Sequence, residues 1–404
     1  MSKHNIVIVG GGFGGIKAAL ELSHDHRFKV ILISDHDDFR VYPTLFHVST
    51  GGSHRGASIP LTEIFVSKSV NVVIDTVTDI DKVGHTVTTK SGETFTYEAV
   101  IFGLGVMTNY FGISGLSEFS YGIKTLSDAE ELKAHLHKQL CTDRQYDLNY
   151  VVIGGGPTGV ELAGALPHYI KTIAKHQGLK KRKVHVDLIE AAPRLVPRMP
   201  KDISRAITRN LRKQGVKIYT KTAVQAQTAD ALMVGGKPIR SHTVIWTAGV
   251  ANSPFFKDHD FQIARNGKVR VDQFLQAEPG IYVIGDNADT PYSGMAQTAL
   301  YDGKFVAQNL QRIASSQTPE PYKAKKPIYV LPAGPKWAAV LWGKVRIFGW
   351  LGWTLRSLAD LMLYHDYLPV NKATSRWAAM NDQEDYCPHC GNEMAKLKYL
   401  SGEQ

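Results

Sequence analysis

Two glycine-rich loops, far apart in the sequence, most strongly limit what this chain can fold into. Each follows a short apolar stretch and precedes a helical pattern: Gly10-Gly11-Gly12-Phe13-Gly14-Gly15 follows residues 6–9, and Gly154-Gly155-Gly156-Pro157-Thr158-Gly159 follows residues 151–153. Strand, glycine-rich turn and helix in that order are typical of a dinucleotide-binding βαβ unit. Glycine is needed because a pyrophosphate must approach the N–H groups of the helix N-terminus, where a Cβ would collide. The sequence therefore predicts two dinucleotide sites.

An acidic residue ends the strand that follows each loop. Asp35 follows residues 30–34, and Glu190 ends residues 184–190. A carboxylate at this position accepts hydrogen bonds from the adenosine ribose and repels a 2′-phosphate, so Glu190 favours NADH over NADPH. The basic run 180–183 would weaken this preference if it reached the nucleotide, although a solvated loop is the commoner explanation.

A third acid, Asp286, follows Gly285 just beyond the apolar stretch 281–284. A carboxylate at the end of a buried strand can hold a polyol hydroxyl, whereas Gly-Asp alone is an ordinary turn. The two glycine-rich loops upstream favour the binding role.

Several shorter motifs, taken with these loops, resemble those of the two-dinucleotide flavoproteins, and among them the type II NADH:quinone oxidoreductases. The motifs are Leu104-Gly105 with residues 109–113, Trp246-Thr-Ala-Gly-Val250, Gly285-Asp286 and Ala296-Gln297-Thr298-Ala299. Together they are specific, and the resemblance covers residues 4–365. It implies an enzyme that transfers a hydride from NADH to FAD and two electrons onward to a membrane quinone, without proton pumping.

The resemblance also implies which residues hold the cofactors. The FAD residues would be the first loop (Gly10, Gly12, Gly14, Gly15), Asp35, Gly105, Asp286 and Ala296. The NADH residues would be the second loop (Gly154, Gly156, Thr158, Gly159), Glu190 and Gly249.

Three further residues are predicted to act on the substrates. Glu161 lies near the start of the helix after the second loop, where the helix dipole stabilises a carboxylate, and the family has a glutamate here near the flavin. Gln297 is retained from the family's quinone-contacting Ala-Gln-x-Ala-x-Gln stretch, in which Tyr301 replaces the second glutamine. A satisfied polar residue on a core helix is the alternative for Gln297. Lys344 would be a quinone-site cation or a simple lipid anchor.

Strand and helix patterns alternate along the chain, which indicates an α/β fold with two Rossmann-like dinucleotide-binding domains. Residues 1–115 and 256–320 would form the FAD-binding domain, into which the NADH-binding residues 116–255 are inserted. Residues 321–380 would be a membrane-associating extension and 381–404 a tail. The expected strands are 71–80, 85–90, 99–104, 184–190, 216–220, 244–247 and 281–285, and a helix is expected over 127–139.

The extension is aromatic and basic. It holds five of the six tryptophans and much of the excess behind the formal net charge of +10. Arg346, Arg356 and Asp360 interrupt its apolar runs, so a spanning helix of about 20 apolar residues is not expected. Helical spacing of Phe348, Leu351, Leu355, Leu358 and Met362 instead predicts a helix in the membrane interface, with Lys/Arg toward anionic lipid. A buried dimer or domain contact is the alternative.

The two ends of the chain add a localisation and a metal hypothesis. The N-terminus runs directly into residues 6–9 and leaves no room for a signal peptide, so we expect a peripheral protein on the cytoplasmic face of the cell membrane. Cys387 and Cys390 resemble one knuckle of a zinc ribbon, but zinc needs four ligands. Two tails would have to share the ion, as in a homodimer, or the pair is a free or redox-active dithiol.

Two other functions remain compatible with these patterns. One is an NAD(P)H-dependent flavoprotein reductase that serves a small iron–sulfur protein; the other is a basic, flavin-containing binding or redox-sensor protein. Disulfide-reducing relatives need a cysteine pair near the flavin, and residues 36–60 contain none. No nucleic-acid partner is expected, because the basic residues flank an apolar segment instead of forming a continuous face.

Overall fold

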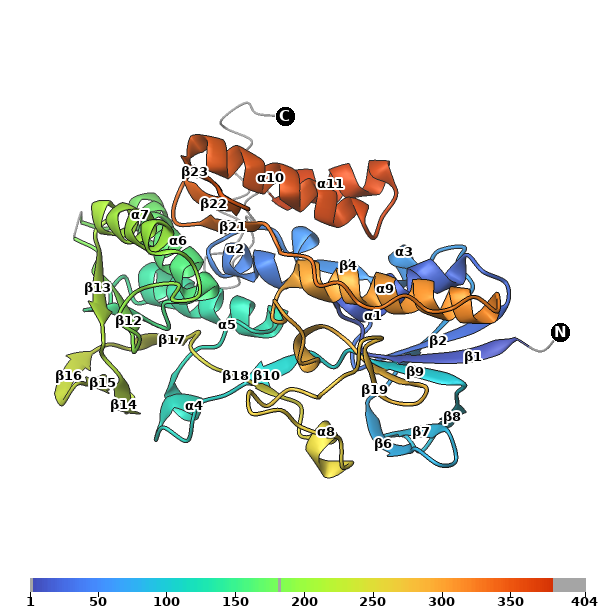
Figure 1. Ribbon diagram of the computed structural model, residues 1–404. Coiled ribbons are helices and arrows are strands. Elements are labelled where there is room, and N and C mark those ends of the chain that lie inside the picture. Colours follow the sequence, from blue (N-terminus) through green and yellow to red (C-terminus); the bar gives the residue numbers. More distant parts are fainter. Residues whose placement is uncertain (1–2, 181–182, 381–404) are drawn as a thin grey trace.

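The computed structural model of the protein describes residues 3–180 and 183–380. In it, a six-stranded sheet carries the first glycine-rich loop. Side chains of β1 alternate between two cores, with Ile6 and Ile8 on one face and Val7 and Val9 on the other. Helices α1 and α9 cover the first face, and a small antiparallel sheet covers the second (Figure 1). The sheet runs β19 (Gln276–Glu278), β20 (Ile281–Val283), β9 (Ala99–Phe102), β1 (His4–Val9), β2 (Phe28–Ser34), β5 (Val70–Ile74). The covering elements are α1 (Phe13–Ser23), α9 (Ala296–Ala314), β6 (Val77–Asp81), β7 (Thr86–Thr89) and β8 (Thr94–Thr96).

A second parallel sheet carries the second loop and has the same construction. Tyr150 and Val152 of its strand β11 face the helices, while Val151 and Ile153 face an antiparallel sheet. Its order is β13 (Val216–Thr220), β12 (Val186–Glu190), β11 (Tyr150–Ile153), β17 (Thr243–Trp246). Around it lie α5 (Leu126–His137), α6 (Pro157–His176), α7 (Lys201–Lys213), β14 (Val224–Gln227), β15 (Ala231–Val234) and β16 (Lys237–Arg240). The predicted α/β fold with two Rossmann-like units is confirmed.

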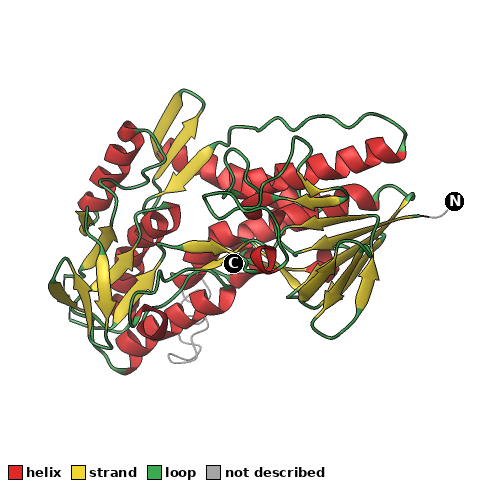
Figure 2. Cartoon of the chain, turned by 60° about the horizontal axis from the view of Figure 1, so that its bottom comes forward, coloured by secondary structure: helices red, strands yellow, loops and turns green. Residues whose placement is uncertain are grey.

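The two units lie side by side, as Figure 2 shows, and two strands join them. β10 (Val106–Thr108) leaves the first unit and pairs antiparallel with β18 (Val250–Asn252), which returns from the second. The predicted domain limits stay predictions. The shorter elements are β3 (Asp38–Arg40), η1 (Tyr42–Thr44), α2 (Leu45–Ser49), η2 (His54–Gly56), β4 (Ser58–Pro60), α3 (Leu61–Ile64), α4 (Leu116–Phe119), η3 (Lys138–Thr142), α8 (Phe255–Asp258) and η4 (Gly285–Asn287).

One expected strand, over residues 71–80, was wrong because the chain turns within it. The Asp75 carboxylate accepts hydrogen bonds from the N–H groups of Thr76 (2.7 Å) and Ser91 (3.1 Å). Such side-chain-to-backbone bonds compete with a strand ladder. The segment therefore divides into β5 and β6, which belong to different sheets.

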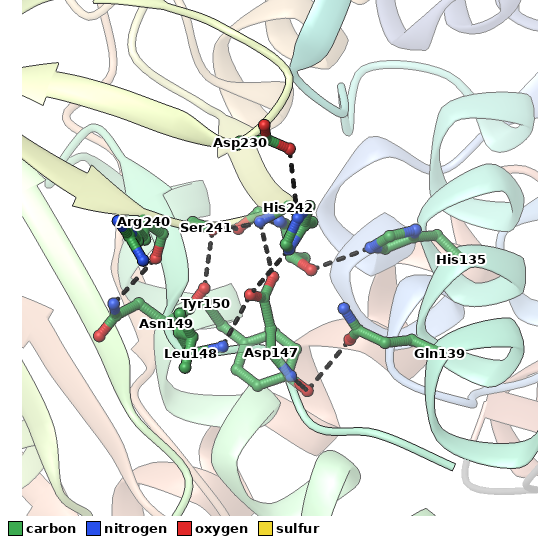
Figure 3. A network of polar contacts seen from close by, with 11 residues as sticks. His135, Gln139, Asp147, Leu148, Asn149, Tyr150, Asp230, Arg240, Ser241 and His242 are labelled. Carbon is green, nitrogen blue, oxygen red and sulfur yellow. Dashed lines mark hydrogen bonds and ion pairs between the residues drawn. The ribbon is translucent and has the colours of Figure 1, made fainter. Parts of the chain in front are cut away.

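A polar network ties the starts of β11 and β17 together (Figure 3). Asp147 accepts from the N–H of His242 at 2.9 Å, Ser241 Oγ donates to Asn149 O at 2.7 Å, and His135 contacts Thr243 Oγ1 at 2.9 Å. These strand ends are opposite the carboxyl ends, where α/β proteins bind their ligands. We therefore assign the network to stability.

The C-terminal layer packs across both units. It consists of β21 (Tyr329–Pro332), β22 (Ala338–Trp342), β23 (Val345–Gly349), α10 (Trp350–His365) and α11 (Val370–Met380). Its strands join the core around α2 and α6, and Tyr367, just after α10, donates a hydrogen bond to Phe13 O of the first loop at 2.9 Å. No helix within the described ranges is long and apolar enough to cross a membrane.

Helix α10 is polar inside and apolar outside. Its buried residues are Gly352, Arg356, Asp360 and Tyr364, whereas Leu351, Leu358 and Met362 are exposed by 60%, 49% and 70%. Two expectations are corrected here. Phe348 belongs to β23, because a positive φ at Gly349 starts a new element, and Arg356 points inward to two carboxylates instead of toward lipid.

Candidate functional site

A cleft of about 1470 Å³ opens at the carboxyl ends of both sheets. This is the edge at which doubly wound α/β proteins bind nucleotides. The first loop, the start of α6 and the start of α9 line it together, and α10 closes one side. Of the predicted site residues, those in the lining are Gly10, Gly12, Gly14, Asp35, Gly105, Thr158, Glu161, Asp286, Ala296 and Gln297.

The third glycine of each loop leaves room for a ligand. Gly12 and Gly156 have φ of −94° and −73°, which any residue can adopt, and a Cβ built on either meets no atom within 4 Å. Backbone strain and protein packing therefore do not explain why these two positions are glycine. Both are the N-caps of helices whose first turns carry no side-chain cap and no acidic residue. Free N–H groups and an open space fit the pyrophosphate of a dinucleotide.

The last glycine of each loop serves a different purpose. A Cβ on Gly15 would lie 2.1 Å from Gly10 O, and one on Gly159 would lie 1.9 Å from Gly154 O. These positions let the helix pack close to its strand. The two loops therefore have matching geometry, which fits one dinucleotide in each.

The residues predicted for FAD gather around the first loop. Asp35 is exposed at the end of β2, and its hydrogen bond with His36 lowers the pKa of the carboxyl. Asn287, which the sequence did not single out, is fully buried and bonds both the N–H (3.0 Å) and the carbonyl (2.7 Å) of Gly105. It thereby connects the segment that follows β9 to the segment that follows β20, which carries Asp286. The residues present fit FAD.

Of the residues predicted for NADH, only Thr158 lines the cleft. The Glu190 carboxylate accepts hydrogen bonds from the N–H groups of Gly155 and Ala192, both at 2.6 Å, so it braces its own loop. Gly249 allows close packing, because a Cβ there would lie 2.2 Å from Asn109 O. Its neighbour Val250 lines the cleft.

Two charged groups near the first loop were missed, of which Lys124 is partly buried and Asp302 fully buried. Lys124 lies with Nζ 4.4 Å from the centre of the Tyr42 ring, and burial lowers the pKa of its ammonium group. Asp302 of α9 accepts from Gly285 N–H (3.0 Å) and from Tyr322 O–H (2.6 Å), and burial raises its pKa to about 6. Neither belongs to a motif with an obvious chemical pattern, so only the packing identifies them.

Glu161 is part of a buried triad with Arg356 and Asp360. Arg356 Nε donates to both Asp360 oxygens at 2.9 and 2.8 Å, and Nη1 donates to Glu161 Oε1 at 3.2 Å. The remaining donors reach Pro43 O at 3.1 Å and Val330 O at 3.4 Å. All three side chains are at least nine-tenths buried and line the cleft.

Two carboxyls face one guanidinium in this triad, so the charges do not balance if both are ionised. Burial raises the pKa of Glu161 to about 7, against the opposing effect of Arg356, and also raises the pKa of Asp360. The nearby His47 carries no charge at neutral pH, because burial lowers its pKa to about 4. Glu161 is therefore partly protonated near neutral pH, at the wall of the cleft.

Glu161→Gln is expected to flatten the dependence of stability on pH. Since folding raises the pKa of Glu161 from 4.5 to about 7, its contribution is intact below pH 4.5 and is lost as pH rises to 7. The amide keeps an oxygen for Arg356 but cannot titrate. Urea unfolding from pH 5 to 8 should show a smaller decrease in the free energy of unfolding than in the unaltered protein. Some slope will remain from Asp302 and Asp360, and an unchanged slope would contradict the assignment.

Gln297 and Lys344 lie apart from each other. Gln297 bonds the backbone of Ile328 through both side-chain groups, at 2.9 and 3.1 Å, and lines the cleft. Tyr301, one turn later, contacts Tyr322 and has Lys325 Nζ 4.3 Å from its ring centre. Lys344 is exposed in the turn between β22 and β23 and does not line the cleft.

The zinc hypothesis concerns Cys387 and Cys390, which lie outside the described residues. Over residues 3–180 and 183–380, no three His, Cys, Asp or Glu side chains gather as a metal site would require.

Comparison with known proteins agrees with this geometry. The family profile described as "Pyridine nucleotide-disulphide oxidoreductase" matches residues 4–303. The type II NADH:quinone oxidoreductase Ndh of Mycobacterium tuberculosis is 30% identical over 89% of this chain and 85% of its own length. The type II NADH:quinone oxidoreductase of Staphylococcus aureus is 24% identical over 80% and 85%.

Solved structures show the same fold. NDH2 from Plasmodium falciparum, in complex with NADH, matches with a TM-score of 0.84 at 18% identity, over 94% of this chain and 97% of that one. The sulfide:quinone oxidoreductase of Aquifex aeolicus matches with a TM-score of 0.78 at 20% identity, over 91% and 92%.

Proposed function

Because the chain belongs to the pyridine nucleotide-disulphide oxidoreductase family, and within it to the type II NADH:quinone oxidoreductases, we propose that it oxidises NADH and reduces a membrane quinone through FAD. The observation that carries this proposal is the cleft that the first glycine-rich loop lines together with Pro157 and Thr158 of the second, while the third glycine of each loop has open space beside it. Both nucleotides can then approach one another across the boundary between the sheets.

The chemistry divides between the cofactor and the chain. FAD, when bound, supplies the group that accepts a hydride and passes on two electrons. The first loop and Asp286 bind it, and the second loop orients the nicotinamide nucleotide. Residues 36–60 contain no cysteine, so the segment just after Asp35 offers no dithiol to carry electrons from the flavin to a disulfide.

Reduction of a quinone to a quinol also consumes two protons. The Glu161 carboxyl, with a pKa of about 7, is partly protonated at neutral pH and lies in the cleft wall beside α10, so it is our proposed source of one of them. Arg356 and Asp360 hold this carboxyl in position. Gln297, fixed by the backbone of Ile328, is the proposed neighbour of the quinone ring.

We further propose that the protein binds a lipid surface through the exposed face of α10. Aromatic and aliphatic side chains on one side of a helix are typical of a helix lying in the membrane interface. The cytoplasmic face is the proposed side, since NADH is a cytoplasmic reductant. A homodimer through the same face is the competing proposal.

The function is tested by anaerobic stopped-flow absorbance of the flavin band. NADH should bleach the band rapidly, NADPH slowly, and a soluble quinone analogue should restore it. Bleaching without return of colour by quinone would indicate a protein acceptor such as a small iron–sulfur protein. Absence of bleaching by either nucleotide would overturn the enzymatic proposal.

A further inference from the structure

Helix α7 of the second unit presents a row of basic side chains to solvent. Its inward face is apolar, with Ile203, Ile207 and Leu211 fully or almost fully buried. Arg205 and Arg209 are exposed on the outward face, four residues apart and therefore on one side of the helix. Lys201, Arg212 and Lys213 extend this row, which we call the α7 ridge.

The ridge is not neutralised by the protein. In the part of the chain that the structure describes, no carboxylate within 4 Å pairs with its five side chains, and the helix's own Asp202 pairs with Arg346. Two hollows flank it, of about 720 and 450 Å³, and Arg205, Arg209 and Lys213 line both. Uncompensated cations around a hollow attract an anionic group.

The second hollow connects the ridge to the apolar C-terminal layer. Its far wall is Trp337 and Phe348, whose rings stack with centroids 6.3 Å apart. Beyond Phe348 the chain continues into Trp350 and Leu351 at the start of α10, exposed by 62% and 60%. Figure 1 shows α7, β22, β23 and α10 along the same edge of the molecule. A basic surface and an apolar one are therefore continuous.

We propose that the α7 ridge binds the phosphate groups of anionic phospholipids, so that the NADH-binding unit lies against the bilayer alongside α10. The inference rests on the proposed function, because a membrane quinone brings this edge to the lipid. Apolar insertion and electrostatic attraction act together at membrane interfaces. The sequence analysis expected the lipid-facing cations to lie in residues 321–380. In the structure, however, Arg356 is buried and Arg346 pairs with Asp202.

The test compares Arg205→Glu/Arg209→Glu with a charge-matched control, Lys237→Glu/Arg240→Glu, on the exposed strand β16 away from α10. Binding is measured by co-sedimentation with phosphatidylcholine vesicles, with or without phosphatidylglycerol. Each cation near an anionic surface strengthens binding roughly fivefold, so losing two weakens binding to the anionic vesicles about 25-fold. The two added carboxylates are repelled by the surface, which takes the expected loss to roughly 100-fold or more. Binding to the neutral vesicles is weaker, and neither double variant should change it. The control variant should keep nearly all of its affinity for the anionic vesicles.

Three outcomes would overturn the proposal. Equal loss in both variants would indicate a general charge effect, and no loss in either would remove α7 from the membrane contact. If the ridge variant kept its vesicle affinity but changed from dimer to monomer in sedimentation velocity, the ridge would bind a second copy of the chain. Reduction of a soluble quinone by NADH should persist in both variants. Its absence from the unaltered protein would reject the enzymatic function, whereas vesicle binding would still decide the lipid site.

Discussion

Arg356→Leu is expected to lower the free energy of unfolding by about 3–5 kcal/mol, the typical result of removing one partner from a buried ion pair. Glu161 and Asp360 would then lie in the interior without the guanidinium that pairs with both. Both carboxyls would bind protons more tightly, so the loss should increase with pH between 5 and 8. Urea unfolding at several pH values, followed by tryptophan fluorescence, measures it.

The controls separate the charge from the packing at this position. Arg356→Lys keeps a cation but lacks the planar guanidinium. Its free energy of unfolding should lie between those of the leucine variant and the unaltered protein. The triple variant Glu161→Leu/Arg356→Met/Asp360→Leu removes all three charges and should recover most of the stability, because apolar replacement of a buried charged cluster is often neutral. It should nevertheless reduce quinone slowly. A leucine variant as stable as the unaltered protein would show that the triad contributes nothing.

Gly156→Ala is expected to weaken NADH binding by roughly 100-fold, about 3 kcal/mol, while the protein retains FAD and folds normally. The added methyl meets no protein atom within 4 Å, so only the nucleotide phosphates can collide with it. Gly12→Ala is the matched variant in the other loop. It should lose FAD during purification and keep its affinity for NADH.

Titration of each apoprotein and holoprotein, by flavin fluorescence for FAD and by calorimetry for NADH, measures both affinities. The decisive result is that Gly156→Ala weakens only NADH binding and Gly12→Ala weakens only FAD binding. If Gly12→Ala weakened NADH and Gly156→Ala weakened FAD, the assignment of the loops would be reversed. If neither affected either ligand, the open space at these glycines would not be the pyrophosphate site.

Local patterns predicted much of this molecule. Strand, glycine-rich turn and helix are adjacent in the chain, and their geometry depends on the glycines themselves. The two glycine-rich loops, the strand ends at Asp35 and Glu190, and the α/β fold were therefore accessible from sequence. The division of residues 71–80 was not, because hydrophobic alternation continues across the turn that Asp75 stabilises.

Features that depend on tertiary contacts were missed or misassigned. Arg356 and Asp360 appeared to interrupt a lipid-facing helix, yet they pair with each other, and Arg356 also pairs with Glu161, almost 200 positions earlier. Asn287 and Asp302 act on backbone groups whose positions only the folded chain defines. Glu190 ends its strand as predicted, but its two hydrogen bonds to the loop could not be foreseen from spacing.

The inverted polarity of α10 also determines how far a lipid-soluble substrate must travel. One side of the helix is the exposed stripe around Leu358 and Met362, and the other side holds Arg356 against Glu161. A helix with its side chains is about 10 Å across. If the stripe rests in the interface, the Glu161 carboxyl lies only that distance from the hydrocarbon. A quinone can then reach this proposed proton donor by crossing the width of a single helix, without an aqueous path between membrane and protein.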